Sequence, residues 1–162
     1  MEQMEGHHVQ EADPHDQDFS DFYRVEYPGM VRLAVSLTGD VDRAEDIVQD
    51  AFARLHGRFA SLDRPGGYLR TAVVNLCRDQ RRRGVLEQRE SRRPAPGSLS
   101  LEASEMIDVL LHLPFKQRAV LVLRYWGDWT EAEIAEAVGC RPGNVKSLAS
   151  RGLDTLRREV AR

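Results

Sequence analysis

The chain has 162 residues, of which 41% are hydrophobic and 30% are charged, and its formal net charge is −3. This composition is typical of a globular protein with one medium domain or two small ones. No apolar run approaches the length that crosses a bilayer, and the N-terminus lacks the segments of a secretory signal. We therefore expect a cytoplasmic protein with no membrane contact of its own.

The charges are distributed unevenly along the chain. Residues 1–21 contain seven acidic side chains and no Lys or Arg, whereas residues 78–93 and 141–162 each have a net charge of +4. Affinity for nucleic acid that is independent of sequence comes mostly from the neutralisation of phosphates by basic side chains. Two basic segments in an acidic chain therefore indicate weak DNA binding by the chain alone and dependence on a partner.

Few side chains indicate metal or redox chemistry. Residues 1–17 lack apolar periodicity, and we expect a disordered acidic leader there. Cys77 and Cys140 are not part of a CxxC pair, so buried structural thiols are the preferred interpretation of both. A disordered tail is also preferred over a metal site formed by His7, His8 and His15.

Two amphipathic helices are predicted after the leader. The first begins at Asp18, ends near Gly39, and is kinked or restarted at Pro28. The second begins after Asp42 as a plausible N-cap and runs to about His56. No His motif, nucleophile or Gly-rich phosphate loop accompanies the polar face of this second helix, so a solvated face and a docking face for a basic partner are the alternatives to catalysis. That face contains Asp46, Gln49, Asp50 and Ala53.

An arginine-rich helix is predicted next. Residues 57–67 have the composition of a loop, and helical periodicity then extends from Tyr68 to about Arg83. Arginine near a helix C-terminus is favoured by the helix dipole. Seven arginines within residues 78–93 exceed that need, so we favour a surface that faces nucleic acid.

Residues 84–100 are predicted to be a flexible linker, because Pro-Ala-Pro-Gly-Ser interrupts any helix there. Fully extended, this segment would reach about 56–61 Å. That reach exceeds one turn of duplex DNA, about 34–36 Å. The linker would divide the chain into helical domains at residues 18–83 and 101–162, which could occupy separate sites on one DNA.

The second domain is predicted to have four helices. The first begins near Leu101 and breaks at Pro114, and the next runs from Phe115 to Tyr125. Trp126 and Trp129, which follow this helix, are predicted to anchor the core of the domain rather than to stack on bases.

The last two helices have well-defined start and stop signals. Thr130 with Glu133 three residues later predicts a capping box, and Gly139 supplies the left-handed residue that ends a helix. Pro142 suits the first turn of the final helix. One stripe of that helix is apolar, at Val145, Ala149, Gly152, Leu153, Leu156 and Val160. The opposite stripe contains Asn144, Lys146, Ser147, Ser150, Arg151 and Asp154.

Two short helices, a tight turn and a polar, basic second helix predict a DNA-binding helix-turn-helix. A helical hairpin with an ordinary solvated face is the simpler alternative for this stretch.

Together these segments resemble the extracytoplasmic-function sigma factors of bacterial RNA polymerase. The resemblance rests on DFYRVEYPGMVRLAVSLTGD, AEDIVQDAFARLH, YLRTAVVNLCRDQRRR and LPFKQRAVLVLRYWGDWTEAEIAEAVGCRPGNVKS. It extends from Asp18 to Val160 in the order of the family, and it is nearest to the SigE-type group common in actinobacteria.

The resemblance implies a role for each segment. The second helix would dock on the clamp helices of the largest polymerase subunit through Asp46, Gln49 and Asp50. The arginine-rich helix would read and open the −10 element through Asn75, Arg78, Arg81 and Arg82. A loop from Arg58 to Gly67 would border the pocket for a flipped base. The last helix would read the −35 element through Asn144, Lys146, Ser147, Ser150 and Arg151.

Two positions depart from the family. Arg141 replaces a common Ser cap, so we expect a less firm start of the last helix. Leu148 replaces a common Arg, which removes a phosphate contact. Because no further domain follows Arg162 in this sequence, we expect regulation by an external anti-sigma factor.

We therefore predict an all-α sigma factor of two small helical domains, sigma region 2 and sigma region 4. It would have no catalytic activity, metal or cofactor, and its partners would be promoter DNA and core polymerase, including the flap of the second-largest subunit. A stand-alone helix-turn-helix regulator and a helical adaptor that binds an acidic protein remain the alternatives.

Overall fold

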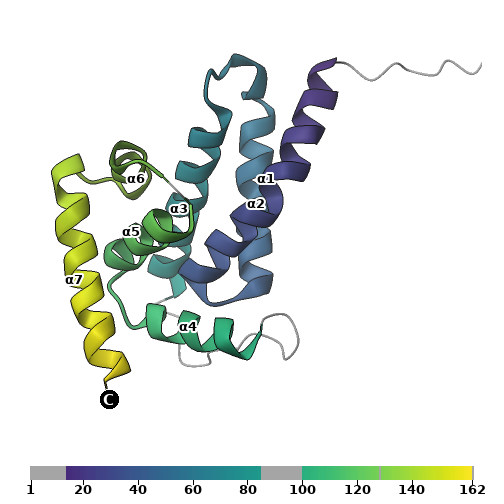
Figure 1. Cartoon of the computed structure of the whole chain (residues 1–162). Coiled ribbons are helices and arrows are strands. Elements are labelled where there is room, and N and C mark those ends of the chain that lie inside the picture. The colour runs from purple at the N-terminus through teal and green to yellow at the C-terminus, as the bar shows by residue number, and fades with distance from the viewer. Residues whose placement is uncertain (1–13, 85–99, 128, 162) are drawn as a thin grey trace, which may run out of the picture.

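The computed structural model describes residues 14–84, 100–127 and 129–161, and within these ranges it contains helices and no strand (Figure 1). None of the described helices is long and apolar enough to cross a membrane. The helices are α1 (Pro14–Thr38), α2 (Val41–His56), the short 3₁₀ helix η1 (Phe59–Ser61), α3 (Pro65–Gly84), α4 (Leu101–Leu111), α5 (Phe115–Trp126), α6 (Glu131–Val138) and α7 (Pro142–Val160).

Helix α1 differs from its prediction at two places. It begins at Pro14 rather than Asp18, so residues 14–17 are helical, while residues 1–13 of the expected leader lie outside the described part of the chain. It also continues through Pro28 without restarting. Pro28 and Arg24, whose carbonyl loses its amide partner, are both exposed residues, so water can replace the missing hydrogen bond.

The start of α2 corrects a second expectation. Asp40, not Asp42, is the N-cap, and its carboxylate accepts a hydrogen bond from the backbone N–H of Arg43 at 3.0 Å. Gly39 before it has φ +74°, which turns the chain between the two helices. The predicted polar face of α2 is confirmed, because the buried side chains lie opposite it, at Ala44, Ile47, Val48, Ala51, Phe52 and Leu55.

Helix α3 begins at Pro65, three residues before the predicted start at Tyr68. Proline is well suited to the first turn of a helix, where its missing N–H has no partner to lose. The expected loop at residues 57–67 therefore contains η1 and the first turn of α3.

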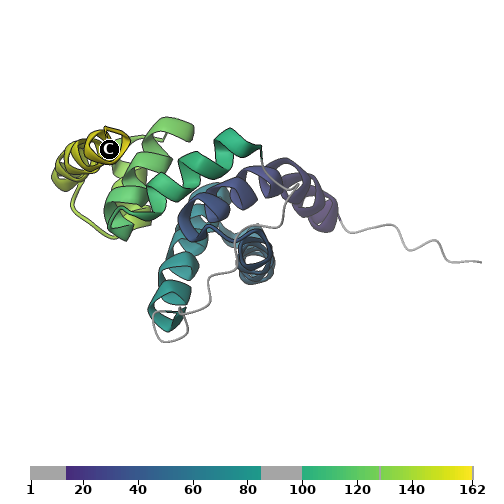
Figure 2. The same cartoon turned by 90° about the horizontal axis from the view of Figure 1, so that it is seen from below.

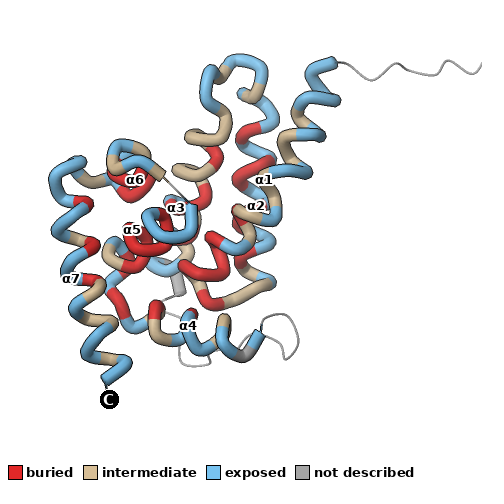
Figure 3. Tube along the Cα trace, viewed as in Figure 1, coloured by how far each residue is buried: buried red, intermediate tan, exposed pale blue. Residues whose placement is uncertain are grey.

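The two halves of the molecule pack against each other. Helices α1 to α3 form one group and α4 to α7 another, and the two lie side by side when seen from below (Figure 2). Helix α6 contacts α3, while α4 and α5 contact α1. Buried hydrophobic residues from both groups belong to one core cluster, and Figure 3 shows buried positions in both groups of helices. Separate tethered domains were predicted, and no residue pattern had indicated this contact.

Trp126 is another correction. It was predicted to anchor the core, but 57% of its surface is exposed at the last position of α5. Trp129, three residues later, is partly buried and packs against the apolar cluster, as predicted.

Arg118 of α5 is the most buried charged side chain of the described residues, with 3% of its surface exposed. Its guanidinium donates hydrogen bonds to the carbonyls of Leu110, Leu111 and Leu113 at 2.9, 3.2 and 3.0 Å. It donates a fourth at 2.5 Å to the carbonyl of Leu37, at the end of α1. Burial, followed by the nearby charge of Arg81, lowers the pKa of Arg118 to about 10. One side chain thus joins the two halves.

Replacing Arg118 with Met should destabilise the protein. Met fills a similar apolar volume but donates no hydrogen bond, so the carbonyls of Leu37, Leu111 and Leu113 lose the bonds that Arg118 donates. We expect the free energy of unfolding to fall by about 3 kcal/mol, measured by urea denaturation followed by circular dichroism. Arg124→Met, at an exposed position of the same helix, is the control and should change stability little. Equal stability of the two variants would contradict the role assigned to Arg118.

Candidate nucleic-acid interface

Helix α6 begins with the predicted capping box. The Thr130 hydroxyl accepts a hydrogen bond from the N–H of Glu133 at 3.2 Å, and the Glu133 carboxylate accepts one from the N–H of Thr130 at 2.8 Å. The bond from the Thr130 backbone, followed by one that the Thr130 hydroxyl donates to the same carboxylate at 3.1 Å, lowers the pKa of Glu133. Gly139 then ends the helix at φ +71° and ψ +48°, also as predicted. The turn of a helix-turn-helix is therefore fixed by local rules.

Helix α7 presents a polar face to solvent. Its inner side buries Val145, Ala149 and Gly152. Gly152 approaches α5 so closely that an added Cβ would lie 2.8 Å from a methyl carbon of Leu121. The five residues predicted to read duplex DNA are all exposed on the outer side: Asn144, Lys146, Ser147, Ser150 and Arg151.

Of the predictions for the two ends of α7, the one for the N-terminus is confirmed and the one for the C-terminus is wrong. Arg141 is the N-cap and makes no side-chain capping bond, as its departure from the family pattern predicted. Val160 was placed on the apolar stripe, but 76% of its surface is exposed because α7 extends past its neighbours at that end. On the polar face, the Arg151 guanidinium donates to the Ser147 hydroxyl at 2.8 Å. That bond orients two of the five predicted DNA-reading residues.

The four candidate −10 residues of α3 do not share one environment. Asn75, Arg81 and Arg82 are exposed. Arg78 is partly buried, donates a hydrogen bond at 2.7 Å to the carbonyl of Val138 in α6, and lies with its guanidinium carbon 5.8 Å from the centre of the Phe115 ring. Its Nε is buried without a hydrogen-bond partner among the described residues. In this arrangement Arg78 is therefore engaged by the other half of the molecule.

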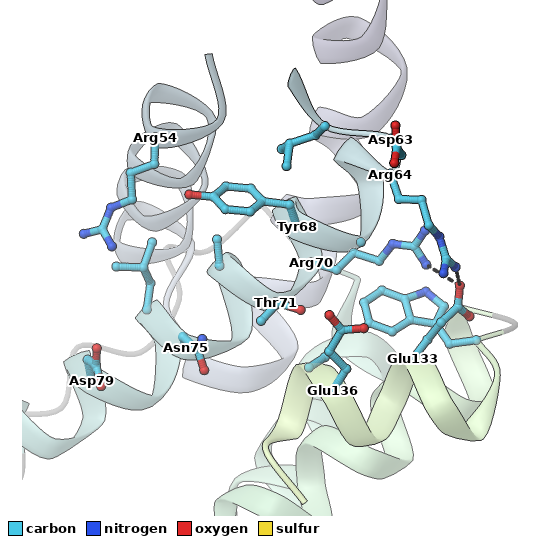
Figure 4. A pocket seen from close by; sticks show the side chains of 16 residues that line it. Arg54, Asp63, Arg64, Tyr68, Arg70, Thr71, Asn75, Asp79, Glu133 and Glu136 are labelled. Atoms are coloured by element: carbon cyan, nitrogen blue, oxygen red, sulfur yellow. Dashed lines mark hydrogen bonds and ion pairs between the residues drawn. The ribbon is translucent and has the colours of Figure 1, made fainter. Parts of the chain in front are cut away.

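A cavity of about 490 Å³ lies between α3 and α6 (Figure 4). Asn75, Thr71 and Tyr68 of α3 line one side, and Glu133 and Glu136 of α6 face them. The basic side chains that border it are Arg54, Arg64 and Arg70. Arg70 and Thr71, which are partly buried, were not among the predicted site residues, and nothing in the sequence indicated that α6 forms one wall of this cavity.

The candidate docking face of α2 is open. Asp46, Gln49 and Asp50 are exposed on the side opposite the core. Asp50 forms an ion pair with Arg54 at 3.0 Å, and both side chains are about half-exposed. The face is therefore acidic at its centre and accessible to a basic partner.

Metal chemistry finds no support in the described residues, where no group of three or more His, Cys, Asp or Glu side chains could hold an ion. Cys77 is buried, as predicted, and burial raises the pKa of its thiol to about 12, although nearby Arg118 acts in the opposite direction. Cys140 is only partly buried. His7 and His8 lie outside the described residues.

Comparison with known protein families assigns both halves. Residues 22–87 match the family Sigma-70 region 2, and residues 103–156 match the family Sigma-70, region 4. The RNA polymerase sigma-E factor of Streptomyces coelicolor is 33% identical over an alignment that covers 88% of this chain and 86% of its own. This chain belongs to the extracytoplasmic-function sigma factors.

Further relatives agree with this assignment. The sigma factor SigW of Bacillus subtilis is 28% identical and covers 99% of this chain and 98% of its own. The sigma factor RpoE from Bartonella quintana, solved in complex with the anti-sigma factor NepR, has a TM-score of 0.73 at 26% identity, over 90% of this chain and 98% of its own. CnrH, solved with the cytosolic domain of CnrY, shares the fold at a TM-score of 0.70 and 20% identity.

The sigma-factor prediction, the all-α fold and the two sigma regions are thus confirmed. A sigma factor binds RNA polymerase and directs promoter-specific transcription, and it is an initiation factor rather than an enzyme. This sigma factor's individual contact residues remain predictions, and the geometry above defines the faces on which they lie.

Two glycines near the turn should respond oppositely to alanine. Gly139 has φ +71°, a conformation that costs an L-residue about 1 kcal/mol, so Gly139→Ala should lower the free energy of unfolding by about that amount. Gly143 lies in α7 with no atom within 4 Å of an added Cβ. Gly143→Ala should therefore raise stability by about 0.5 kcal/mol. Thermal unfolding measures both, and a stabilising Gly139→Ala would contradict the left-handed turn.

Proposed function

We propose that this sigma factor reads the −35 element with α7, reads and opens the −10 element with α3, and docks on core polymerase with α2. Residues 18–83 and 101–162 would be the two functional units. The observation that carries the proposal is the exposed polar face of α7, which is backed by the buried stripe of Val145, Ala149 and Gly152. A recognition helix needs this division, because only an exposed face can enter the major groove.

The −35 contacts can be divided by chemistry. Arg151 and Lys146 can donate to guanine O6 and N7 in the major groove, and Ser147 and Ser150 can donate or accept. Because Arg151 is already held by Ser147 at 2.8 Å, part of the conformational entropy of its long side chain is lost before DNA binds. Asn144 lies in the first turn of α7, whose N-terminus also favours a phosphate.

For the −10 element we propose that a flipped base enters the cavity beside Asn75. Extrusion of a base costs a few kcal/mol, which stacking and hydrogen bonds in the pocket must return. Tyr68 supplies an aromatic ring and Asn75 an amide on the same side of the cavity. Arg81 and Arg82, exposed near the end of α3, would neutralise phosphates of the strand.

The exposed face of Asp46, Gln49 and Asp50 would bind the clamp helices of the largest polymerase subunit, and the region 4 half would bind the flap of the second-largest. We also propose an anti-sigma factor as a regulator, on the analogy of RpoE, which was solved with NepR. Because core polymerase is in the cytoplasm, the protein would act there.

The −35 assignment can be tested with Lys146→Ala combined with Arg151→Ala. Each lost base contact costs about 1–3 kcal/mol, so transcription by reconstituted holoenzyme from a −35-dependent promoter should fall at least tenfold. Lys116→Ala with Arg124→Ala removes the same charge from exposed positions of α5 and is the control. The loss should vanish on a template with a scrambled −35 element, and normal transcription by the double variant would disprove this use of α7.

The −10 assignment can be tested with Asn75→Ala. Loss of one hydrogen bond to the extruded base costs about 1 kcal/mol, so promoter opening should fall about fivefold, measured by permanganate reactivity of −10 thymines. A template with a pre-opened −10 region should restore the signal, because it removes part of the unpairing cost. Equal opening by wild type and variant on duplex templates would remove Asn75 from the site.

A further inference from the structure

Aromatic contacts attach the short helix η1 to α1. The ring of Phe59 in η1 packs against those of Phe19 and Phe22 in α1, with ring centres 5.3 Å apart in both pairs. The rings of Phe19 and Phe59 meet at 83°, and such edge-to-face pairs stabilise a structure beyond the area that they bury. Leu62, directly after η1, also packs against the apolar cluster. The segment between α2 and α3 is therefore held by α1 as well as by its neighbours in the chain.

Hydrogen bonds fix the backbone of Arg58, the residue that precedes η1. Its N–H donates to the carbonyl of Leu55 in α2 at 2.9 Å. Its carbonyl accepts hydrogen bonds from the N–H and the hydroxyl of Ser61, at 3.0 and 2.8 Å. Arg58 is exposed, and its guanidinium carbon lies 5.3 Å from the centre of the Tyr68 ring in α3. The Arg58 side chain thus extends from a fixed backbone position onto the ring of Tyr68.

The ring that Arg58 contacts lies on the side of α3 that holds Asn75. Asn75 follows Tyr68 by about two helical turns, so both side chains lie on one side of the helix. Figure 4 shows Tyr68, Thr71 and Asn75 along this side. A base stacks on an aromatic ring only when the two planes can lie parallel, so the orientation of the Tyr68 ring matters for stacking. A guanidinium over a ring is attracted by the ring's electrons, which restrains that orientation.

We propose that Arg58 is a positioning residue of the −10 site, which holds the Tyr68 ring in the orientation on which an extruded base stacks. This role rests on the proposed −10 function of α3. It assigns Arg58 an action through Tyr68, whereas most arginines at a nucleic-acid surface neutralise a phosphate directly. The contact joins η1 to α3 within region 2, so it does not depend on where the region 4 half lies.

Two substitutions of Arg58 separate positioning from a phosphate contact. Arg58→Gln removes both the charge and the guanidinium, whereas Arg58→Lys keeps the charge but loses the planar group that stacks on a ring. Arg24→Gln is the matched control, because it removes one positive charge from an exposed position of α1 that does not line the cavity. Circular dichroism should show that all three variants keep the helical content of the wild type.

The role can be tested in reconstituted holoenzyme by fluorescence anisotropy. The probe is a labelled single strand with the −10 element of a promoter that the wild type opens, intact or made abasic at one −10 position at a time. Wild-type holoenzyme should bind about fivefold more weakly when the extruded base is missing, because its stacking is lost. Arg58→Gln and Arg58→Lys should each weaken binding of the intact strand about two- to fivefold. Neither should change binding of that abasic strand, and Arg24→Gln should bind both strands as the wild type does.

A merely structural role or a phosphate contact gives a different pattern. Either one would weaken binding of the intact and the abasic strand equally, and a phosphate contact would also be restored by Arg58→Lys. Both results would overturn the positioning role. In a Tyr68→Leu background, Arg58→Gln should add no further loss, because its action requires the ring, and additive losses would likewise contradict the proposal.

The same experiment shows separately whether the −10 function itself fails. A wild-type holoenzyme that binds the intact strand and every abasic strand equally would overturn the base-extrusion site, and the role of Arg58 with it. Wild-type sensitivity at one position, combined with equal losses on both strands for Arg58→Gln, would leave that site standing and overturn the role of Arg58 alone.

Discussion

Arg118 places a positive charge in the interior of the molecule, at the point where the two halves meet. Its four hydrogen bonds go to main-chain carbonyls at 2.5–3.2 Å rather than to a carboxylate. The last carbonyls of a helix have no partner within the helix, and here those of α1 and α4 share one guanidinium. The charge can be buried only while both helix ends stay beside it, so Arg118 couples the packing of α5 to the position of α1.

The remaining contacts between the halves are of another kind. Arg64, Arg70 and Arg78 reach from region 2 to α6 through an ion pair, a ring face and a single carbonyl. Arg64 is exposed, and Arg70 and Arg78 are partly buried. A nucleic acid could supply substitutes for each of these, whereas nothing in solvent substitutes for the ring of carbonyls around Arg118. The interface thus combines a buried anchor with exchangeable contacts over the −10 face.

Local chemistry explains what the sequence could predict. The capping box of Thr130 and Glu133 and the left-handed Gly139 depend on residues within one turn, so the helix-turn-helix was predictable. Asp40 and Asp42 are both suitable caps, and only the backbone conformation selects Asp40. The cavity was not predictable, because its ion pair joins residues 69 positions apart in the chain. The Arg118 anchor, which spans 81 positions, was missed for the same reason.

Glu133 takes part both in a contact within one helical turn and in a contact between distant parts of the chain. Its carboxylate holds the first turn of α6 through Thr130 and also faces Arg64 and Arg70 across the cavity. The hydrogen bonds from Thr130, and then the two arginines, lower its pKa below 4.5. A carboxyl group whose pKa falls on folding stabilises the fold above its unfolded value and loses that contribution as the pH falls through the lower folded value. The Thr130 hydrogen bonds and the two arginines both favour the ionised carboxylate. Near neutral pH, the start of α6 and its contact with region 2 therefore depend on the same charge. A glutamine could still complete the capping box, but it would lose the charge that the Thr130 hydrogen bonds favour and the ion pairs with Arg64 and Arg70.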